Sequence, residues 1–338
     1  MFALVCALAV LGWTQAAPPP AKTEKPVTLG RVFKLGQRMK YEVRSSLQIQ
    51  HRMIGLETFI PEDLDIIYSF TTEVTKMKPD GIAELRYLRP TMTQIAGETA
   101  DSGPVSHVEK TNLDFLLTVT PVNDIIDEKD MTPKKKDKPK SGGSLLLRRG
   151  TPAAQIQGLI GSYVQEIYRL SLFVGSLDSS LDFSPRLPLD DVSVGDTWKR
   201  TVGYSPQKVK GKEGKASVQR LDYTYTYRGI DTWNGKKVYK ITSDLNLDSD
   251  LATFFNDMFD AKPEETNLKS IPLKLKANVV FYLDAATMHT LEADASTEGG
   301  FKVVLTNMAA NAVEEQNLKG HSTMKLLGIS QVPPAKQK

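Results

Sequence analysis

Four histidines are the first residues to test for chemistry, because imidazole serves both as a proton-transfer group and as a metal ligand. They are His51, His107, His289 and His321. No two of them have the spacing of a metal-binding pair, and the HExxH motif is absent. His51 and His289 fall on the apolar sides of expected strands, which favours core or edge positions. The sequence therefore predicts no metal ligands.

Motifs for nucleophilic catalysis and phosphate binding are also missing. No GxSxG sequence places a serine on a nucleophile elbow. Two SxxK matches, Ser205 to Lys208 and Ser322 to Lys325, lack the SDN and KTG companions that a serine acyltransferase needs. There is neither a P-loop nor a GxGxxG turn. We therefore assign no catalytic or cofactor-binding residues and predict no cofactor.

One segment resembles the first half of a calcium-binding loop. Oxygen-bearing side chains recur at alternate positions, namely Asp244, Asn246, Asp248 and Asp250. Ser249 replaces the glycine of the sharp turn, and Phe255 stands where a bidentate glutamate would close the loop. We interpret the segment as the wet face of a strand that ends in a helix cap.

A tyrosine-rich segment could form either a sugar-stacking platform or part of a sheet core. Tyr223, Tyr225 and Tyr227 alternate with polar residues, and Trp233 follows them. Strict alternation with Leu221 is typical of one face of a sheet, so the core is the favoured interpretation.

The N-terminus predicts export. Phe2 to Trp13 is an apolar run followed by small residues, which is typical of a signal peptide over residues 1–17, cleaved after Ala16 or Ala17. Cys6, the only cysteine, lies in this leader, so the mature chain must be stable without disulfides. No later segment is apolar enough to span a membrane. We expect a periplasmic, cell-surface or extracellular protein.

The net charge of +3 comes from one segment. Residues 123–150 contain eight Lys or Arg and five acids, so the rest of the chain is neutral. The basic run has no interleaved aromatic residues for base stacking, which argues against nucleic acid as a partner. Its Lys, Pro and Gly content predicts a flexible linker.

Two-residue periodicity dominates the rest of the chain. From Met39 to Met53, apolar and polar residues alternate over fifteen positions, which predicts a long strand with one buried face. Turn signals such as Asn234-Gly235 separate further alternating segments. The pattern predicts a mainly β (α+β) fold of curved antiparallel sheets.

Helices are expected at three places. Thr151 and Pro152 open an apolar helix over residues 151–178, a short helix lies near residues 250–260, and residues 307–316 are a third candidate. The expected order along the chain is: signal peptide 1–17, Pro-rich tether 18–30, first antiparallel β half 31–122, linker 123–150, covering helix 151–178, second β half 179–330 and disordered tail 331–338.

The two β halves are weakly alike. Gly36 to Val43 opens the first long strand, and Gly195 to Val202 opens one in the second half. Each is followed by a hairpin. Two half-barrel-like repeats, each covered by a helix, are therefore one architecture that fits.

Residues 188–198, PLDDVSVGDTW, and the hairpin Trp233 to Ile241, WNGKKVYKI, resemble a family of uncharacterised exported bacterial proteins. The resemblance covers about residues 185–300. It implies export and a β-rich fold, and it carries no catalytic residues. A looser likeness, of architecture alone, is to periplasmic lipid and lipoprotein carriers, in which helices close a curved sheet over an apolar cavity.

These observations favour a non-enzymatic exported protein that binds an apolar ligand inside a curved sheet. Its partner would be an apolar small molecule or lipid, or an envelope protein. The alternatives are a structural or protein-interaction module with a filled core, and, less favoured, a hydrolase without a recognisable motif.

Overall fold

The structure is a computed structural model of the whole chain, and it describes residues 25–52, 56–97, 105–132, 184–204, 219–253, 256, 268–306 and 313–333. The expected signal peptide, the tether up to residue 24, the linker from residue 133 and the covering helix 151–178 lie outside the described residues. The described ranges include long strands near both ends of the sequence, so the pairing between the first and the last of these strands is defined.

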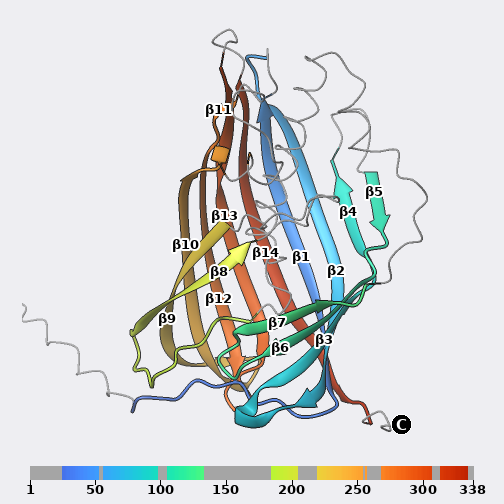
Figure 1. Cartoon of the computed structure of the whole chain (residues 1–338), viewed down its shortest axis with the longest axis vertical. Helices are drawn as coiled ribbons and strands as arrows, with labels where there is room; N and C mark the ends of the chain where they lie inside the picture. The colour runs from blue at the N-terminus through green and yellow to red at the C-terminus, as the bar shows by residue number, and fades with distance from the viewer. Residues whose placement is uncertain are drawn as a thin grey trace, which may run out of the picture.

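All described strands belong to one antiparallel sheet (Figure 1). Alternating sequences account for the long strands, because each buries one set of side chains. The strands are β1 (Gln37–Arg52), β2 (Ile60–Met77), β3 (Ala83–Arg89), β4 (Met92–Ala96), β5 (Val105–Glu109), β6 (Leu113–Val119), β7 (Ile125–Asp130), β8 (Thr197–Tyr204), β9 (Gln219–Trp233), β10 (Lys236–Asp250), β11 (Leu268–Ser270), β12 (Pro272–Asp284), β13 (Thr290–Leu305) and β14 (Val313–Gln331).

The two expected β halves form a single sheet. Its strand order is β7-β6-β3-β2-β1-β14-β13-β12-β10-β9-β8, with β4 and β5 beside the upper part of β2 and β11 beside β13. The first long strand, β1, pairs with the last, β14, along its whole length. The sheet therefore runs without interruption from the N-terminal strands to the C-terminal ones, as one open, curved antiparallel sheet.

The helices predicted to cover the sheet are not supported. Within the described residues, helical conformation is confined to the 3-10 turn η1 (Pro79–Gly81) and to residues 252, 253 and 256. The third helix candidate is wrong over residues 313–316, which begin β14 because pairing with β13 outweighs their local preference. Residues 125–130, expected to belong to the linker, form the edge strand β7.

One face of the sheet carries a continuous apolar core. On β1, residues Met39, Tyr41 and Val43 point inward and are buried, while the residues between them face outward. Aromatic rings stack across strands at one point of this face: Phe70 lies 5.0 Å from Tyr41 and 5.2 Å from Tyr87, centroid to centroid. The other face carries interspersed acidic, basic and hydrophobic side chains.

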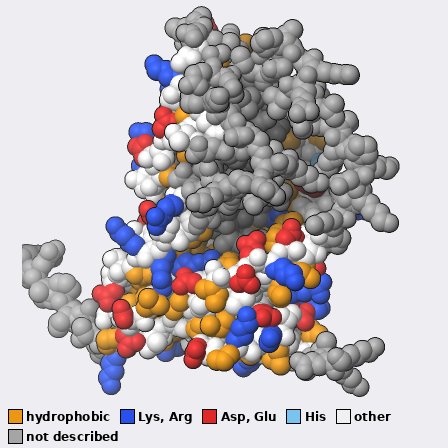
Figure 2. All heavy atoms as spheres, in the orientation of Figure 1, with side chains coloured by type: hydrophobic (Ala, Val, Ile, Leu, Met, Phe, Trp, Pro, Cys, Tyr) orange, Lys and Arg blue, Asp and Glu red, His pale blue; other side chains and the backbone are white. Residues whose placement is uncertain are grey.

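The sheet curls so that its two edges are connected at the lower end in Figure 1, where β1 begins and β14 ends. The segment before β8 connects one edge of the sheet to the other. Its Leu187 amide donates to the Val122 carbonyl, in the β6–β7 turn, at 2.9 Å. Arg200 on β8 lies 3.8 Å from Asp124 in that turn. Residue Val27 forms a bridge with Val192. Figure 2 shows this lower part as a surface of mixed charge.

Two glycines permit close approach of β13 to its neighbours. A Cβ atom at Gly299 would lie 2.0 Å from the Lys274 carbonyl oxygen, and one at Gly300 would lie 2.5 Å from the Gln316 carbonyl oxygen. Gly299 faces inward and Gly300 outward, in register with β12 and β14. Both positions thus require glycine because backbone atoms occupy the space of a side chain.

We predict that Gly299→Ala lowers the free energy of unfolding by about 1–3 kcal/mol, because the added methyl group must displace backbone atoms of β12. Urea denaturation followed by circular dichroism measures the change. Gly328→Ala on β14 is the matched control, since no atom lies within 4 Å of its Cβ position. Equal stabilities for the two variants would contradict the close packing of β13.

Candidate ligand-binding face

A belt of small side chains crosses the middle of the inward face. The belt spans five neighbouring strands, β1, β14, β13, β12 and β10. Its members are buried, with exposed fractions of 0–4%: Ser45, Ser243, Ala277, Ala293, Ala295, Thr297 and Ser322. Larger side chains flank the belt on both sides.

Strand register aligns the belt. Ser45 is opposite Ser322, and Ser322 is opposite Ala295. Ala295 is opposite Val279, which is opposite Ser243. These residues are cross-strand neighbours, so they form one continuous row across the sheet, with Val279 between Ala295 and Ser243.

The belt carries a few hydroxyl groups in an otherwise apolar setting. The Ser322 hydroxyl donates to the Ser45 hydroxyl at 2.9 Å. The Thr297 hydroxyl is one of several buried polar atoms in the described residues for which the structure shows no hydrogen-bond partner, and it is the one that lies on the belt. An unsatisfied buried hydroxyl is costly, so Thr297 marks a point on the belt where a ligand or a water could hydrogen-bond.

A buried polar network lies below the belt, at the lower end of the sheet. Arg31 donates through Nη1 to Asn123 Oδ1 and to Ser184 Oγ, both at 3.3 Å. Asn123 Nδ2 donates to the Pro185 carbonyl at 2.8 Å. Arg186 donates to the Asn123 carbonyl. The network ties the N-terminal segment to both edges of the sheet.

His289 belongs to this network and is neutral. Arg31 Nε donates to His289 Nδ1 at 3.2 Å, which requires an unprotonated Nδ1, and Nε2 lies 3.0 Å from Gln37 Oε1 and donates to it. Burial, and next the positive charge of Arg31, lower the pKa of His289 from 6.5 to about 3. Its role is to accept a hydrogen bond from a buried guanidinium.

Trp198 and Arg200 hold the segment that closes the sheet. Trp198 Nε1 donates to the Arg186 carbonyl at 2.7 Å, and Arg200 Nη2 donates to the Leu187 carbonyl at 2.8 Å. The Trp198 ring stacks on Tyr225 at 5.7 Å. Trp198 belongs to the VGDTW sequence, so that motif serves to dock the closing segment on β8.

The other three histidines lie elsewhere in the sheet. His51 on β1 lies 2.9 Å from Glu314, and this hydrogen bond raises the pKa of His51. His107 is exposed on β5, and His321 on β14 lies 3.1 Å from Asp294. Within the described residues, no group of three or more His, Cys, Asp or Glu could hold a metal ion.

The segment that resembles a calcium-binding loop forms part of a strand. Asp244, Asn246 and Asp248 lie at alternate positions of β10, and their side chains face outward. Asp250 Oδ1 accepts hydrogen bonds from the Ala252 and Ile271 amides at 2.9 and 2.8 Å. The preferred interpretation, a wet strand face ending in a cap, is confirmed.

The tyrosine-rich strand contributes to the core. Tyr223, Tyr225 and Tyr227 are buried on β9, as the alternation predicted. Trp233 Nε1 donates to Glu292 at 3.0 Å. The small-residue belt was missed at the level of sequence, although Ala293, Ala295 and Thr297 at alternate positions of one strand are its signal.

Comparison with known proteins gives distant structural likenesses only. No protein-family model matches the chain, and no curated protein matches it. A lipovitellin structure is similar over 90% of this chain at 9% identity, with a TM-score of 0.43, and this chain spans 26% of the lipovitellin chain. DynF from Micromonospora chersina, at 8% identity, has a TM-score of 0.20 over 96% of this chain and 93% of its own.

An outer membrane lipoprotein-sorting protein domain from Vibrio parahaemolyticus is 6% identical, with a TM-score of 0.17, over 88% of this chain and 87% of its own. These scores do not assign the chain to a family. Of the helical segments in the described residues, none has the length and apolar character to cross a membrane.

We predict that His289 makes folding stability depend on pH. Between about pH 6.5 and pH 3 the unfolded chain binds a proton at this residue and the folded chain does not, so stability falls as the pH falls, by about 1.4 kcal/mol per pH unit. Urea titrations of the wild type and of His289→Gln, repeated across this range, measure the contribution as the difference in slope.

The exposed residue His107 supplies the control for this experiment. His107→Gln should retain the wild-type slope, because it lies outside the buried network. If instead the His289→Gln and wild-type curves run parallel, His289 accepts a proton in the folded state and the described hydrogen bond from Arg31 is wrong.

Proposed function

We propose that this protein binds an apolar ligand against the small-residue belt of the curved sheet, and that the ligand carries one polar group that hydrogen-bonds to Thr297. The protein acts as a carrier or receptor and not as a catalyst. The proposal includes export, as predicted from residues 1–17.

The observation that carries the proposal is the belt itself. A sheet that only had to fill its core would place large side chains at the centre of its concave face, since these bury more apolar area. Here Ala277, Ala293 and Ala295 occupy that centre on two adjacent strands. Small side chains leave depth above the sheet that an acyl chain or a similar apolar group could occupy.

The belt lies on the inward face of the curved sheet. Every strand of the described residues belongs to the one curved sheet. The belt is nevertheless shielded from water, because its members are buried. A buried row of small side chains with one unsatisfied hydroxyl, that of Thr297, supports a ligand that is mostly apolar and has one polar end.

Native mass spectrometry of residues 18–338, purified after export, tests the proposal directly. Organic extraction of the same sample would identify any bound molecule. A stoichiometric apolar molecule is the expected result. An apo mass that stays unchanged after incubation with membrane extract would instead favour the alternative of a structural or interaction module.

We predict that Ala295→Phe lowers the affinity for a fluorescent fatty acid, cis-parinaric acid, by at least about tenfold, because the ring fills the centre of the belt. Fluorescence titration measures the affinity. Ser296→Phe is the matched control, since it adds the same ring one residue later, on the outward face of β13.

Both variants must retain the wild-type circular dichroism spectrum for the comparison to hold. Thr297→Val provides a second variant without added bulk. It should weaken binding of the fatty acid and leave binding of a hydrocarbon unchanged. Undiminished fatty-acid binding by both Ala295→Phe and Thr297→Val would place the ligand elsewhere.

A further inference from the structure

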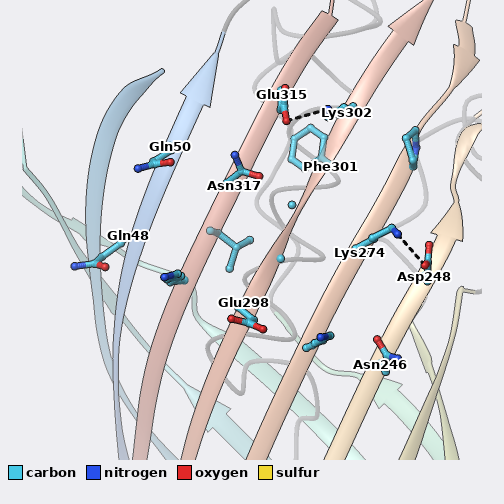
Figure 3. A pocket seen from close by; sticks show the side chains of 16 residues that line it. Gln48, Gln50, Asn246, Asp248, Lys274, Glu298, Phe301, Lys302, Glu315 and Asn317 are labelled. Atoms are coloured by element: carbon cyan, nitrogen blue, oxygen red, sulfur yellow. Dashed lines mark ion pairs between the residues drawn. The ribbon is translucent and has the colours of Figure 1, made fainter. Parts of the chain in front are cut away.

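The outward face of the sheet contains a polar groove that is separate from the belt. Its volume is about 880 Å³, and it crosses β1, β14, β13, β12 and β10 near their upper ends. Figure 3 shows the side chains of these five strands that surround it. A groove of this size suits a ligand of several hundred daltons and is far larger than a single ion needs.

Gly300 lies in one cross-strand row of the groove lining. In this row Lys274 is opposite Gly300, which is opposite Asn317, which is opposite Gln50. The Asn317 carboxamide oxygen would lie 2.6 Å from a Cβ atom at Gly300, so the amide leans over the glycine backbone. The floor is therefore backbone and amide, with longer side chains around it.

The charged residues at the rim are already paired. Lys274 Nζ lies 3.2 Å from Asp248, and Lys302 Nζ lies 3.2 Å from Glu315. Both pairs are drawn in Figure 3. These residues stabilise the rim, and their charges are largely compensated without a ligand.

The adjacent row places three charged residues side by side. Lys276 is opposite Glu298, and Glu298 is opposite Lys319. None of the three forms an ion pair within 4 Å with any residue that the structure describes. Their ammonium groups can only donate hydrogen bonds and the carboxylate can only accept them. The row therefore presents two positively charged ammonium groups, with a hydrogen-bond-accepting carboxylate between them.

Amide side chains complete the lining. Gln48 lies opposite Lys319, and Asn246 lies opposite Lys276, so an amide stands at each end of the charged row. Amides both donate and accept hydrogen bonds. The aromatic ring of Phe301 borders the groove but is buried, with 2% of its surface exposed, so it offers no platform on which a nucleobase could stack.

We propose that this groove binds an acidic oligosaccharide. The anionic groups of the sugar pair with Lys276 and Lys319, and its hydroxyl groups donate to Glu298 and exchange hydrogen bonds with the amides. Hydroxyl-rich ligands match a lining that mixes donors and acceptors, and the two ammonium groups select the acidic sugar over a neutral one. This site is independent of the proposed apolar ligand.

Isothermal titration calorimetry with tetragalacturonic acid, an acidic oligosaccharide, tests the proposal, with maltotetraose as the neutral probe. We expect the wild type to bind the acidic probe at least about tenfold more tightly than the neutral one, with affinity that falls as salt rises. The double variant Lys276→Met/Lys319→Met should lose at least about tenfold in affinity for the acidic probe.

The double variant Lys40→Met/Lys199→Met is the matched control. It removes the same charge from two exposed lysines on β1 and β8 outside the groove and should keep the wild-type affinity. Equal weakening by the two double variants, no preference for the acidic probe, or no binding by the wild type would each overturn the proposal. Ala295→Phe should leave this affinity unchanged, which separates the groove from the belt.

Discussion

The pairing of β1 with β14 is the constraint on which the rest of the structure depends. Every residue from Gln37 to Arg52 has a partner on β14, the last strand of the chain. This pairing unites strands from the two ends of the sequence into one sheet and brings the belt and the groove together, since both cross β1 and β14. Such long-range pairing gives the fold a large share of non-local contacts, which is typical of slowly folding proteins.

Strand β13 contributes residues to both the belt and the groove. Side chains of successive residues point to opposite faces, so Gly299 faces the apolar side and Gly300 the polar side. At both residues atoms of the neighbouring strands occupy the space of a side chain. One strand thus contributes to two surfaces of opposite polarity.

Alternation in the sequence was sufficient to predict β1, β9 and β10, because each long strand buries one complete set of side chains. It did not predict the β1–β14 pairing, since alternation fixes which face is buried and not which strands are neighbours. Residues 125–130 resemble a linker in sequence because an edge strand with both faces partly wet can be highly charged. The sequence did not predict the groove for a related reason. Its lining comes from five strands, and only their register places Lys276, Glu298 and Lys319 in one row.

The environment of His289 bears on the kind of function that the fold supports. A histidine that transfers protons needs a ring nitrogen free to meet a substrate and a pKa near the working pH. Both ring nitrogens of His289 are engaged, by Arg31 and by Gln37, and burial holds its pKa near 3. The neutral ring accepts a hydrogen bond from the Arg31 guanidinium, which is buried where the two sheet edges meet. Because both of its ring nitrogens are engaged, His289 serves the architecture of the sheet and is not placed to transfer a proton to a substrate.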